Sequence, residues 1–516
     1  WIALLLLAAL IPSARFAWQN RDTPQFGFLH DDSLYLVSAK SLITGDGYRI
    51  ESLPEQPYQT KYPPGLPMLL ALAWKLGGGY EGTFGWVTLF GWMTIPLLAL
   101  LSMRLFSDYG LAGWRPVMVG LLLAVNPYFS LFGVNLLAEN LFLCLLLGSF
   151  LLSLRGRSAA APVVAGMAYL VRSAGIVLLA SHPIALWLRG RRRAAMTYVA
   201  ILLPVVAAWM VWSRFHMAPP GKDWIITYYT NYFLYQTQNA TLDIFPILLW
   251  KNVDALLASM GYLVFPKIQN ILAAKIAAQV IACLMISGVV RLTFRHEGAR
   301  DYTLFAIGSA LMLLVWHFPP NERFLLPLAP LLFAGMIVEV ERFADQVRTG
   351  FSHRDRSQRV AAYAIGAVGA VVLLCCLSLQ LWVSQSLMPD TAELSRARRS
   401  DRRVAYDWIR ENTPADAAFV AYDDAVLYLE TGRHATSIPL PTRNLYLGNT
   451  QRQIEIYRDI QEIAHHHSAA YILFTADDLT RDEAPDQRDV IARGLRDNTR
   501  LEQVWSSDRA TIFRVR

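Results

Sequence analysis

The sequence predicts an α-helical membrane protein with many spans, followed by a small α/β domain. Two properties of the composition support this fold class: 54% of the 516 residues are hydrophobic, and only 17% are charged. Soluble domains carry about 25% charged residues, so this chain has too few of them to cover a water-facing surface. Many of the apolar runs also approach the roughly 20 residues that a helix needs to cross a bilayer. We therefore expect an integral membrane protein.

The formal net charge of +7 does not indicate nucleic-acid binding. The arginines concentrate in short segments between apolar runs, as expected for cytoplasmic loops. The four cysteines lie within apolar runs, at Cys144, Cys283, Cys375 and Cys376. Their positions argue against a disulfide framework and against a cysteine-based metal site.

Hydropathy predicts eleven spans, and the first of them also fits an uncleaved anchor. They lie near residues 1–18, 83–103, 115–131, 136–154, 158–171, 173–188, 194–213, 269–290, 302–317, 324–341 and 360–383. The apolar segment 66–79 is shorter and ends in glycines, which favours a re-entrant or interfacial helix. Because arginine-rich loops mark the cytoplasm, an odd number of spans places the remaining large segments outside. These are the 20–65 loop, the 214–268 loop and everything after residue 384.

The pattern changes near residue 389, so we expect a membrane domain over 1–388 and an outer domain over 389–516. Helical stretches at 402–412, 451–465 and 485–497 alternate with β-like runs at 417–422, 470–474 and 511–515. This alternation predicts a small α/β domain. The triplet His465-His466-His467 lies at the end of one helical stretch. Consecutive helical residues point about 100° apart, so we expect a solvated helix end and no shared metal ion.

The first outer loop carries a carboxylate pair, Asp31 and Asp32, at the start of a predicted amphipathic helix that stops at Gly45. Such a helix suits the membrane interface. We expect Asp31 at the N-cap and Asp32 in the first turn. Aspartate stabilises a helix start at both positions, so the two residues could have a structural or a functional role. Lys61 precedes Tyr62 and a Pro-Pro-Gly turn, where a lysine is either a snorkelling anchor or a functional cation.

Three further charged residues are expected at the same depth. Glu139 lies near the outer end of the fourth span, where an ionisable group is costly unless it is paired or functional. Arg172 lies between two spans, and Arg323 begins the tenth span beside a possible ion-pair partner, Glu322. Acidic and basic groups in one layer suit a site for a sugar phosphate. The aromatic run 224–235 fits either an interfacial belt or the wall of an acceptor groove, and we favour the belt.

Four motifs follow one another in an order that resembles the GT-C glycosyltransferases. They are His30–Tyr35 with Gly45–Tyr48, Lys61–Gly65, Leu137–Asn140 and Glu322–Pro327. The resemblance is to the polytopic bacterial branch near the aminoarabinose transferases and protein O-mannosyltransferases. It covers roughly residues 1–345, and the stretch Tyr406–Pro414 is also similar to the outer domain of such proteins.

The resemblance implies an inverting transferase in the bacterial cytoplasmic membrane, with its site and its C-terminal domain on the outer side. The donor would be a polyprenyl-phosphate-linked sugar, and the acceptor a glycolipid, a polysaccharide or a protein. Asp31 would act as general base, although Asp32 stands where many relatives carry glutamate, which leaves open which aspartate acts.

The resemblance also implies roles for the other charged residues. Glu139 would position one of the sugars, and Lys61, Tyr62, Arg172 and Arg323 would bind the departing phosphate. No cofactor is expected. Metal use differs among GT-C groups, and we expect none here because no ligand set is recognisable.

A transporter or flippase for a lipid-linked sugar is the alternative from another class. It would require paired half-repeats and charges near the middle of the bilayer. The chain shows no repeat, and its acidic groups fall at the outer edge. A third possibility, a membrane-anchored binding protein, would not explain why the chain has eleven predicted spans.

Overall fold

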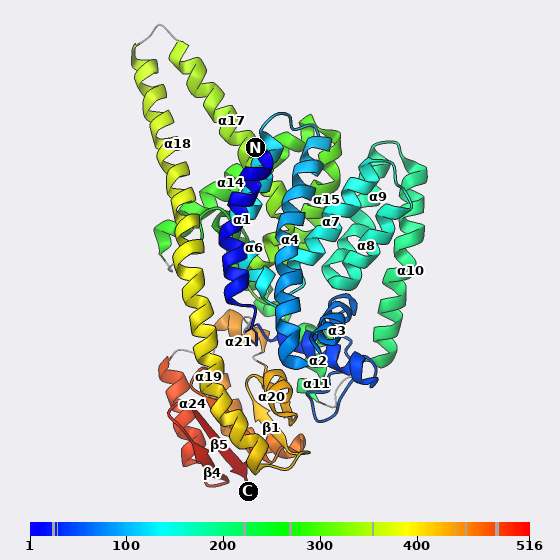
Figure 1. Ribbon diagram of the computed structural model, residues 1–516, viewed down its shortest axis with the longest axis vertical. Helices are drawn as coiled ribbons and strands as arrows, with labels where there is room; N and C mark the ends of the chain where they lie inside the picture. Colours follow the sequence, from blue (N-terminus) through cyan, green and yellow to red (C-terminus); the bar gives the residue numbers. More distant parts are fainter. Residues whose placement is uncertain are drawn as a thin grey trace. The chain divides into compact units, whose positions relative to one another are not determined.

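The chain folds into two compact units in the computed structural model (Figure 1). The structure describes residues 1–22, 26–27, 29–219, 223–267, 271–352, 356–439, 441–448, 451–479 and 485–516. The first unit combines residues 1–21, 88–208 and 251–391, and the second combines 22–87, 209–250 and 392–516. The segment 392–516 is therefore grouped with parts of both predicted outer loops. The domain boundary at residues 388 and 389 stays a prediction.

The first unit is helical. Its elements are α1 (Ile2–Gln19), α4 (Tyr80–Asp108), α5 (Arg115–Val125), α6 (Pro127–Val134), α7 (Glu139–Leu154), α8 (Ala160–Val171), η1 (Ser173–Val177), α9 (Leu178–Leu188), α10 (Arg192–His216), α13 (Phe245–Tyr262), α14 (Leu272–Arg295), η3 (Glu297–Ala299), α15 (Arg300–Leu314), α16 (Glu322–Leu325), η4 (Leu326–Leu328), α17 (Ala329–Ser352), α18 (Arg356–Trp382) and η5 (Val383–Leu387). The ends of α4, α10 and α13 and the start of α19 (Met388–Asn412) carry the chain between the units.

Seven helices among the described residues are long and apolar enough to cross a membrane. The bent pair of α5 and α6, which meet at 51°, raises this number to eight if the pair is one span. The protein is thus a multi-pass membrane protein, but the count of eleven is not confirmed. Helices α7, α8 and α15 contain 16, 12 and 15 residues, fewer than the roughly 20 that a straight span needs.

One candidate span lies where the sequence predicted a loop. The helical stretch Leu242–Tyr262 has 21 residues and passes the same test, although it falls within the expected outer loop 214–268. An additional span changes which loops face outward, so the predicted sidedness is not established.

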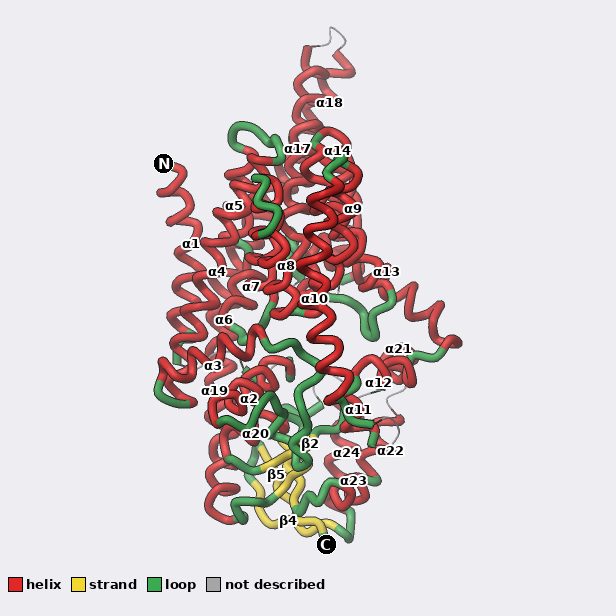
Figure 2. The backbone as a smooth tube through the Cα atoms, turned by 90° about the vertical axis from the view of Figure 1, so that its right-hand side faces the viewer, coloured by secondary structure: helices red, strands yellow, loops and turns green. Residues whose placement is uncertain are grey.

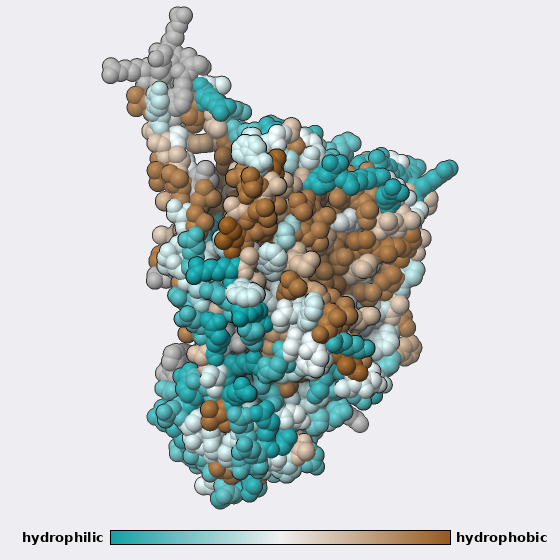
Figure 3. Space-filling model, viewed as in Figure 1, coloured by the Kyte–Doolittle hydropathy of each residue, from teal (hydrophilic) through white to brown (hydrophobic). Residues whose placement is uncertain are grey.

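Close backbone packing and an apolar surface characterise the first unit. Helix α14 packs against α17, and a Cβ added at Gly288 would clash with the carbonyl group of Gly335. Leu100, Leu203 and Val290 are among the large hydrophobic side chains left exposed on its helices. Hydrophobic residues cover a broad area of the face shown in Figure 3. Such a surface is stable against lipid and not against water.

The second unit combines helices with one sheet. Its elements are α2 (Asp31–Thr44), α3 (Gly65–Gly77), α11 (Trp224–Thr230), α12 (Tyr232–Asn239), η2 (Leu242–Ile244), most of α19, β1 (Ala418–Ala421), α20 (Asp424–Thr431), β2 (His434–Thr436), α21 (Thr442–Leu447), α22 (Gln451–Arg458), α23 (Ile460–His466), β3 (Tyr471–Thr475), α24 (Pro485–Asp497), β4 (Leu501–Ser506) and β5 (Ala510–Val515). The strands form one sheet in the order β2-β1-β3-β5-β4 (Figure 2).

The sheet confirms the strands predicted near 417–422, 470–474 and 511–515. Strand β1 pairs in parallel with β2 and β3, while β5 pairs antiparallel with β3 and β4. Strands β2 and β4 were not predicted. Strand β2 is only three residues long, and β4 has only its first residue buried, so neither offers a clear hydrophobic alternation.

One hydrophobic cluster joins the three segments of the second unit. Leu34, Val37, Ile50 and Leu53 come from the first loop, Ile225 and Tyr229 from α11, and Ala425 and Tyr428 from α20. All eight side chains are buried. Helix α2 also packs against α3 and α20. This cluster therefore fixes the start of α2, with its two aspartates, against residues almost 400 positions later in the chain.

Candidate active site

Helix α2 begins one residue earlier than predicted. His30, rather than Asp31, is its N-cap residue, and Asp31 and Asp32 both lie in the first turn. Carboxylates there interact favourably with the positive end of the helix dipole. The helix ends at Thr44, followed by Gly45 in the left-handed conformation, as the sequence predicted. It is not amphipathic as predicted, because two of the three residues expected on its polar face, Ser33 and Ser41, are buried, and only Lys40 is partly exposed.

The two adjacent aspartates have different surroundings. Asp32 is fully buried. Its Oδ1 accepts hydrogen bonds from the backbone N–H groups of Gly27, at 3.2 Å, and Ser33, at 2.6 Å. Asp31 is only partly buried, and its Oδ1 accepts a hydrogen bond from the hydroxyl group of Tyr62. Asp32 thus stabilises the backbone, whereas Asp31 lies where a ligand has access to it.

The turn that carries Lys61 and Tyr62 is held by hydrogen bonds. The Gln59 Oε1 atom accepts from the backbone N–H of both residues, at 3.1 and 3.3 Å. The Tyr48 hydroxyl donates to the carbonyl of Tyr62 at 2.9 Å. Burial, and then the neighbouring Asp31 carboxylate, raise the pKa of Tyr62 well above its usual value. The phenol therefore stays protonated and remains a hydrogen-bond donor at neutral pH.

Three aromatic rings surround the Lys61 ammonium group. Its Nζ atom lies 4.2 Å from the ring centroid of Tyr228, 4.2 Å from that of Tyr232 and 5.1 Å from that of Tyr62. The belt interpretation of the run 224–235 is therefore wrong for Tyr228 and Tyr232. It is also wrong for Tyr229 and Tyr235, which are fully buried. These rings hold the cation by cation–π attraction.

A second polar group beside Asp31 was not predicted. His30 lies 2.8 Å, Nε2 to Oδ1, from Asp424 at the start of α20. The Tyr229 hydroxyl donates to the Asp424 Oδ2 atom at 2.8 Å and lies 2.8 Å from the Ser437 hydroxyl. No spacing rule connects residues that are 394 positions apart. The only sequence signal was the polar His30 immediately before the carboxylate pair.

The other three predicted residues form a separate cluster in the first unit. Glu139 is the first residue of α7 and is fully buried. Its Oε1 atom accepts from Arg172 and, at 2.5 Å, from the Nε group of Arg323. Both guanidinium groups also lie over the ring of Phe324, at 5.4 and 5.7 Å. The sequence suggested Glu322 as a possible ion-pair partner of Arg323, but the structure pairs Arg323 with Glu139.

Two arginines face the single carboxylate of Glu139 in this cluster. The second carboxylate oxygen of Glu139, Oε2, is buried and has no hydrogen-bond partner among the described residues. A buried carboxylate oxygen without a donor is costly. A hydroxyl group of a ligand is one group that could satisfy it.

The seven predicted residues thus fall into two groups. Asp31, Asp32, Lys61 and Tyr62 come together in the second unit, and Glu139, Arg172 and Arg323 come together in the first. Among the described residues, a further cluster has side chains close enough together to hold a metal ion: Asp223, His466 and His467.

Comparisons with known proteins identify the fold. No family model matches the chain, and no curated protein matches it. The structure of ArnT from Cupriavidus metallidurans bound to undecaprenyl phosphate matches with a TM-score of 0.56 and 13% identity, over 99% of this chain and 97% of that chain. The apo oligosaccharyltransferase from Archaeoglobus fulgidus matches with a TM-score of 0.57 and 15% identity, over 92% of this chain and 70% of that chain. Both are GT-C glycosyltransferases. The chain has the GT-C fold.

The GT-C fold confirms the resemblance seen in the four sequence motifs. A third match, the archaeal oligosaccharyltransferase AglB in complex with an inhibitory peptide and a dolichol-phosphate, has a TM-score of 0.53 and 14% identity, over 92% of this chain and 69% of that chain. The GT-C match covers nearly the whole chain, including residues after 345, where the sequence resemblance was confined to Tyr406–Pro414.

Proposed function

We propose that this protein is an inverting glycosyltransferase that moves a sugar from a polyprenyl-phosphate donor to an acceptor of the cell envelope. The observation that carries the proposal is the pairing of Asp31 with Tyr62 beside a lysine held by three aromatic rings. It combines an accessible proton acceptor with a cation and a phenol donor. Glycosyl transfer from a lipid phosphate requires both kinds of group.

Asp31 is the general base in this mechanism. It takes the proton of the acceptor hydroxyl as that oxygen forms a bond to the anomeric carbon. The bond from that carbon to the phosphate oxygen breaks on the opposite face, and its electrons leave with polyprenyl phosphate. A single displacement of this kind inverts the configuration. Asp32 is assigned a structural role instead, because it is fully buried and its Oδ1 atom accepts from two backbone N–H groups.

Lys61 and Tyr62 stabilise the departing phosphate. Negative charge grows on the phosphate oxygens as the bond breaks, and a fixed cation nearby lowers the energy of that state. The aromatic rings keep the Lys61 ammonium group in place without neutralising it. Tyr62 remains protonated and donates a hydrogen bond.

Glu139, Arg172 and Arg323 are assigned to positioning and not to proton transfer. Accepting a proton would cost Glu139 two charge-assisted hydrogen bonds, which makes it a poor base. The guanidinium groups of Arg172 and Arg323 suit a phosphate, and the Glu139 Oε2 atom suits a sugar hydroxyl. The transfer itself needs no metal ion in this proposal.

Two of the matched structures support a lipid-phosphate donor. ArnT was determined with undecaprenyl phosphate, and AglB with a dolichol-phosphate. We place the reaction at the outer face of the bacterial cytoplasmic membrane, with a glycolipid, a polysaccharide or a protein as acceptor. None of the described features favours a transporter.

The test is release of polyprenyl phosphate, measured by mass spectrometry on purified protein in detergent. The protein is incubated with a panel of polyprenyl-phosphate sugars and an envelope extract. Release by the wild type that is absent in Asp31→Asn supports the proposal and identifies the donor. Folded protein that releases nothing from any donor, or equal release by Asp31→Asn, contradicts it.

A further inference from the structure

The sequence predicted a solvated helix end for three consecutive histidines, and the last of them, His467, is buried instead. Helix α23 ends at His466, and His467 caps it. The His467 side chain is only 1% exposed, whereas that of His466 is 62% exposed. Because the helix ends between them, the two imidazole rings turn toward the same point. Their centroids lie 5.1 Å apart.

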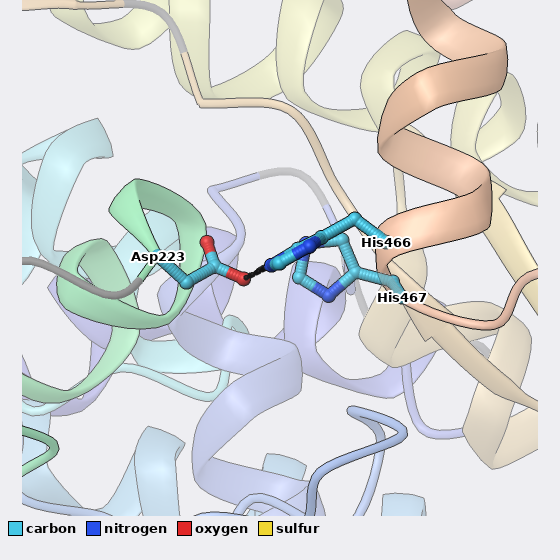
Figure 4. Close-up of side chains that lie close together, drawn as sticks. All are labelled: Asp223, His466 and His467. Carbon is cyan, nitrogen blue, oxygen red and sulfur yellow. Dashed lines mark ion pairs between the residues drawn. The ribbon is translucent and has the colours of Figure 1, made fainter.

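Both rings converge on Asp223, the residue that caps α11 (Figure 4). The Asp223 Oδ2 atom lies 3.2 Å from the Nε2 atom of His466 and 3.2 Å from that of His467. All three candidate ligand atoms lie within 4.8 Å of one another. Two ligands of a tetrahedral zinc ion, each about 2.0 Å from the metal, are about 3.3 Å apart. The two separations from Asp223 match that geometry.

A second carboxylate lies on the far side of His467. The Glu55 Oε1 atom lies 2.7 Å from the Nδ1 atom of His467. Metal-binding histidines usually donate their other N–H group to a carboxylate, which fixes the tautomer and the ring orientation. Glu55 and Asp223 thus face opposite nitrogens of one imidazole, as ligand and supporting carboxylate do in metal sites.

The site is also open to an ion. A cavity of about 460 Å³ is lined by Asp223, His466 and His467, together with polar side chains such as Gln238 and Glu462. Three protein ligands beside a water-accessible cavity leave a fourth position for water. Two imidazoles and one carboxylate favour zinc over magnesium or calcium, which prefer oxygen ligands.

We propose that Asp223, His466 and His467 bind one divalent zinc ion, with Glu55 orienting His467. The ion joins all three segments of the second unit, because Glu55 belongs to the first loop, Asp223 to the second loop, and both histidines to the segment 392–516. Its role is to hold these segments together. The inference does not depend on the proposed transfer reaction.

The test uses tag-free protein, stripped with a chelator in detergent and then titrated with zinc. The wild type is expected to bind one zinc ion per chain and to gain thermal stability on binding. His466→Ala, whose exposed side chain does not support the fold, is expected to weaken binding at least tenfold. Asp223→Asn should do the same, because asparagine keeps the helix cap but lacks the charge. Glu55→Gln is expected to weaken binding by about 10-fold to 100-fold.

His465→Ala is the matched control, because His465 is exposed and is not one of the three candidate ligands. It should bind zinc as the wild type does. Cobalt gives a second readout, since tetrahedral cobalt has visible absorption bands that the His466→Ala variant should lose. Folded wild type that binds no stoichiometric zinc overturns the proposal. Unchanged binding in both His466→Ala and Asp223→Asn also overturns it, as the contacts would then be ion pairs alone.

Discussion

Asp31 and Glu139 are both acidic residues that begin a helix, yet they are held in opposite ways. Asp31 is partly buried and accepts a hydrogen bond from the neutral phenol of Tyr62. Glu139 is fully buried and is neutralised by two arginines. A partly exposed carboxylate can take up a proton from a bound ligand. One held by two cations stays an anion and acts as an anchor. The position at a helix start therefore does not determine the role.

Exchanging the carboxylate of Asp31 should have the largest effect. Asp31→Asn keeps an oxygen that accepts from Tyr62 but loses the base, so we expect kcat to fall by about 10²-fold to 10⁴-fold. The melting temperature should not change. Release of polyprenyl phosphate measures kcat. A kcat near the wild-type value would rule out Asp31 as the base.

Removing one cation from Glu139 should affect stability more than Asp31→Asn does. Arg323→Ala leaves a buried carboxylate with one of its two partners, and breaking a buried pair costs about 3–5 kcal/mol. Thermal unfolding in detergent measures this loss. The control is Arg348→Ala, because Arg348 forms only an exposed pair with Asp345, for which no measurable change is expected. A melting temperature for Arg323→Ala equal to that of the control would contradict the role of Glu139 as an anchor.

Removing one of the three rings around Lys61, which we call the aromatic cage, should have a moderate effect on donor binding. Tyr228→Leu removes one of the rings facing Lys61, and a cation–π contact is worth about 1 kcal/mol, or about fivefold in affinity. We therefore expect the KM for the donor to rise about fivefold, with kcat nearly unchanged. Phe233→Leu, in the same run but 81% exposed, is the matched control. Equal KM values for the two variants would show that the cage does not position Lys61.

The smallest expected effect concerns the pH dependence of thermal stability, to which His30 in the second unit contributes. Burial lowers the pKa of His30, but the charge and hydrogen bond of Asp424 outweigh it, so the pKa is raised; Lys61 lowers it and Asp31 raises it further. A raised histidine pKa stabilises the folded state fully below about pH 6.5, the unfolded value. This contribution is lost as the pH rises through the folded pKa.

Melting temperatures measured between pH 6 and pH 9 should therefore fall less steeply in His30→Asn than in the wild type. His465→Asn, which removes an exposed imidazole, should retain the wild-type slope. A wild-type slope in His30→Asn would show that the pair with Asp424 adds no stability.

Local patterns allowed much of the fold to be predicted from the sequence. The end of α2 at Gly45 and the strands β1, β3 and β5 follow from glycine and from hydrophobic alternation, which depend on neighbouring residues. The number of spans does not follow, because α7, α8 and α15 are shorter than a straight span needs. Helix α13 was missed since lysine and aspartate interrupt its apolar run, at Lys251 and Asp254.

The candidate site was predictable only in part. The sequence identified Asp31, Lys61 and Glu139 by their chemistry and by their order in the chain. It gave no sign of Asp424, and it did not connect Tyr228 and Tyr232 with Lys61, because these contacts join segments far apart in the chain. The burial of His467 was missed for another reason: the helical spacing rule does not apply beyond the last turn of α23.

The pair of His30 and Asp424 has a consequence for how the protein is made. A ribosome adding about 5–20 residues per second needs roughly 20–80 s to proceed from one residue to the other. During that time the loop that carries Asp31 is already synthesised, while the residues that complete its hydrophobic cluster do not yet exist. Stopping translation at residue 388 would therefore yield a membrane-inserted chain that lacks transfer activity.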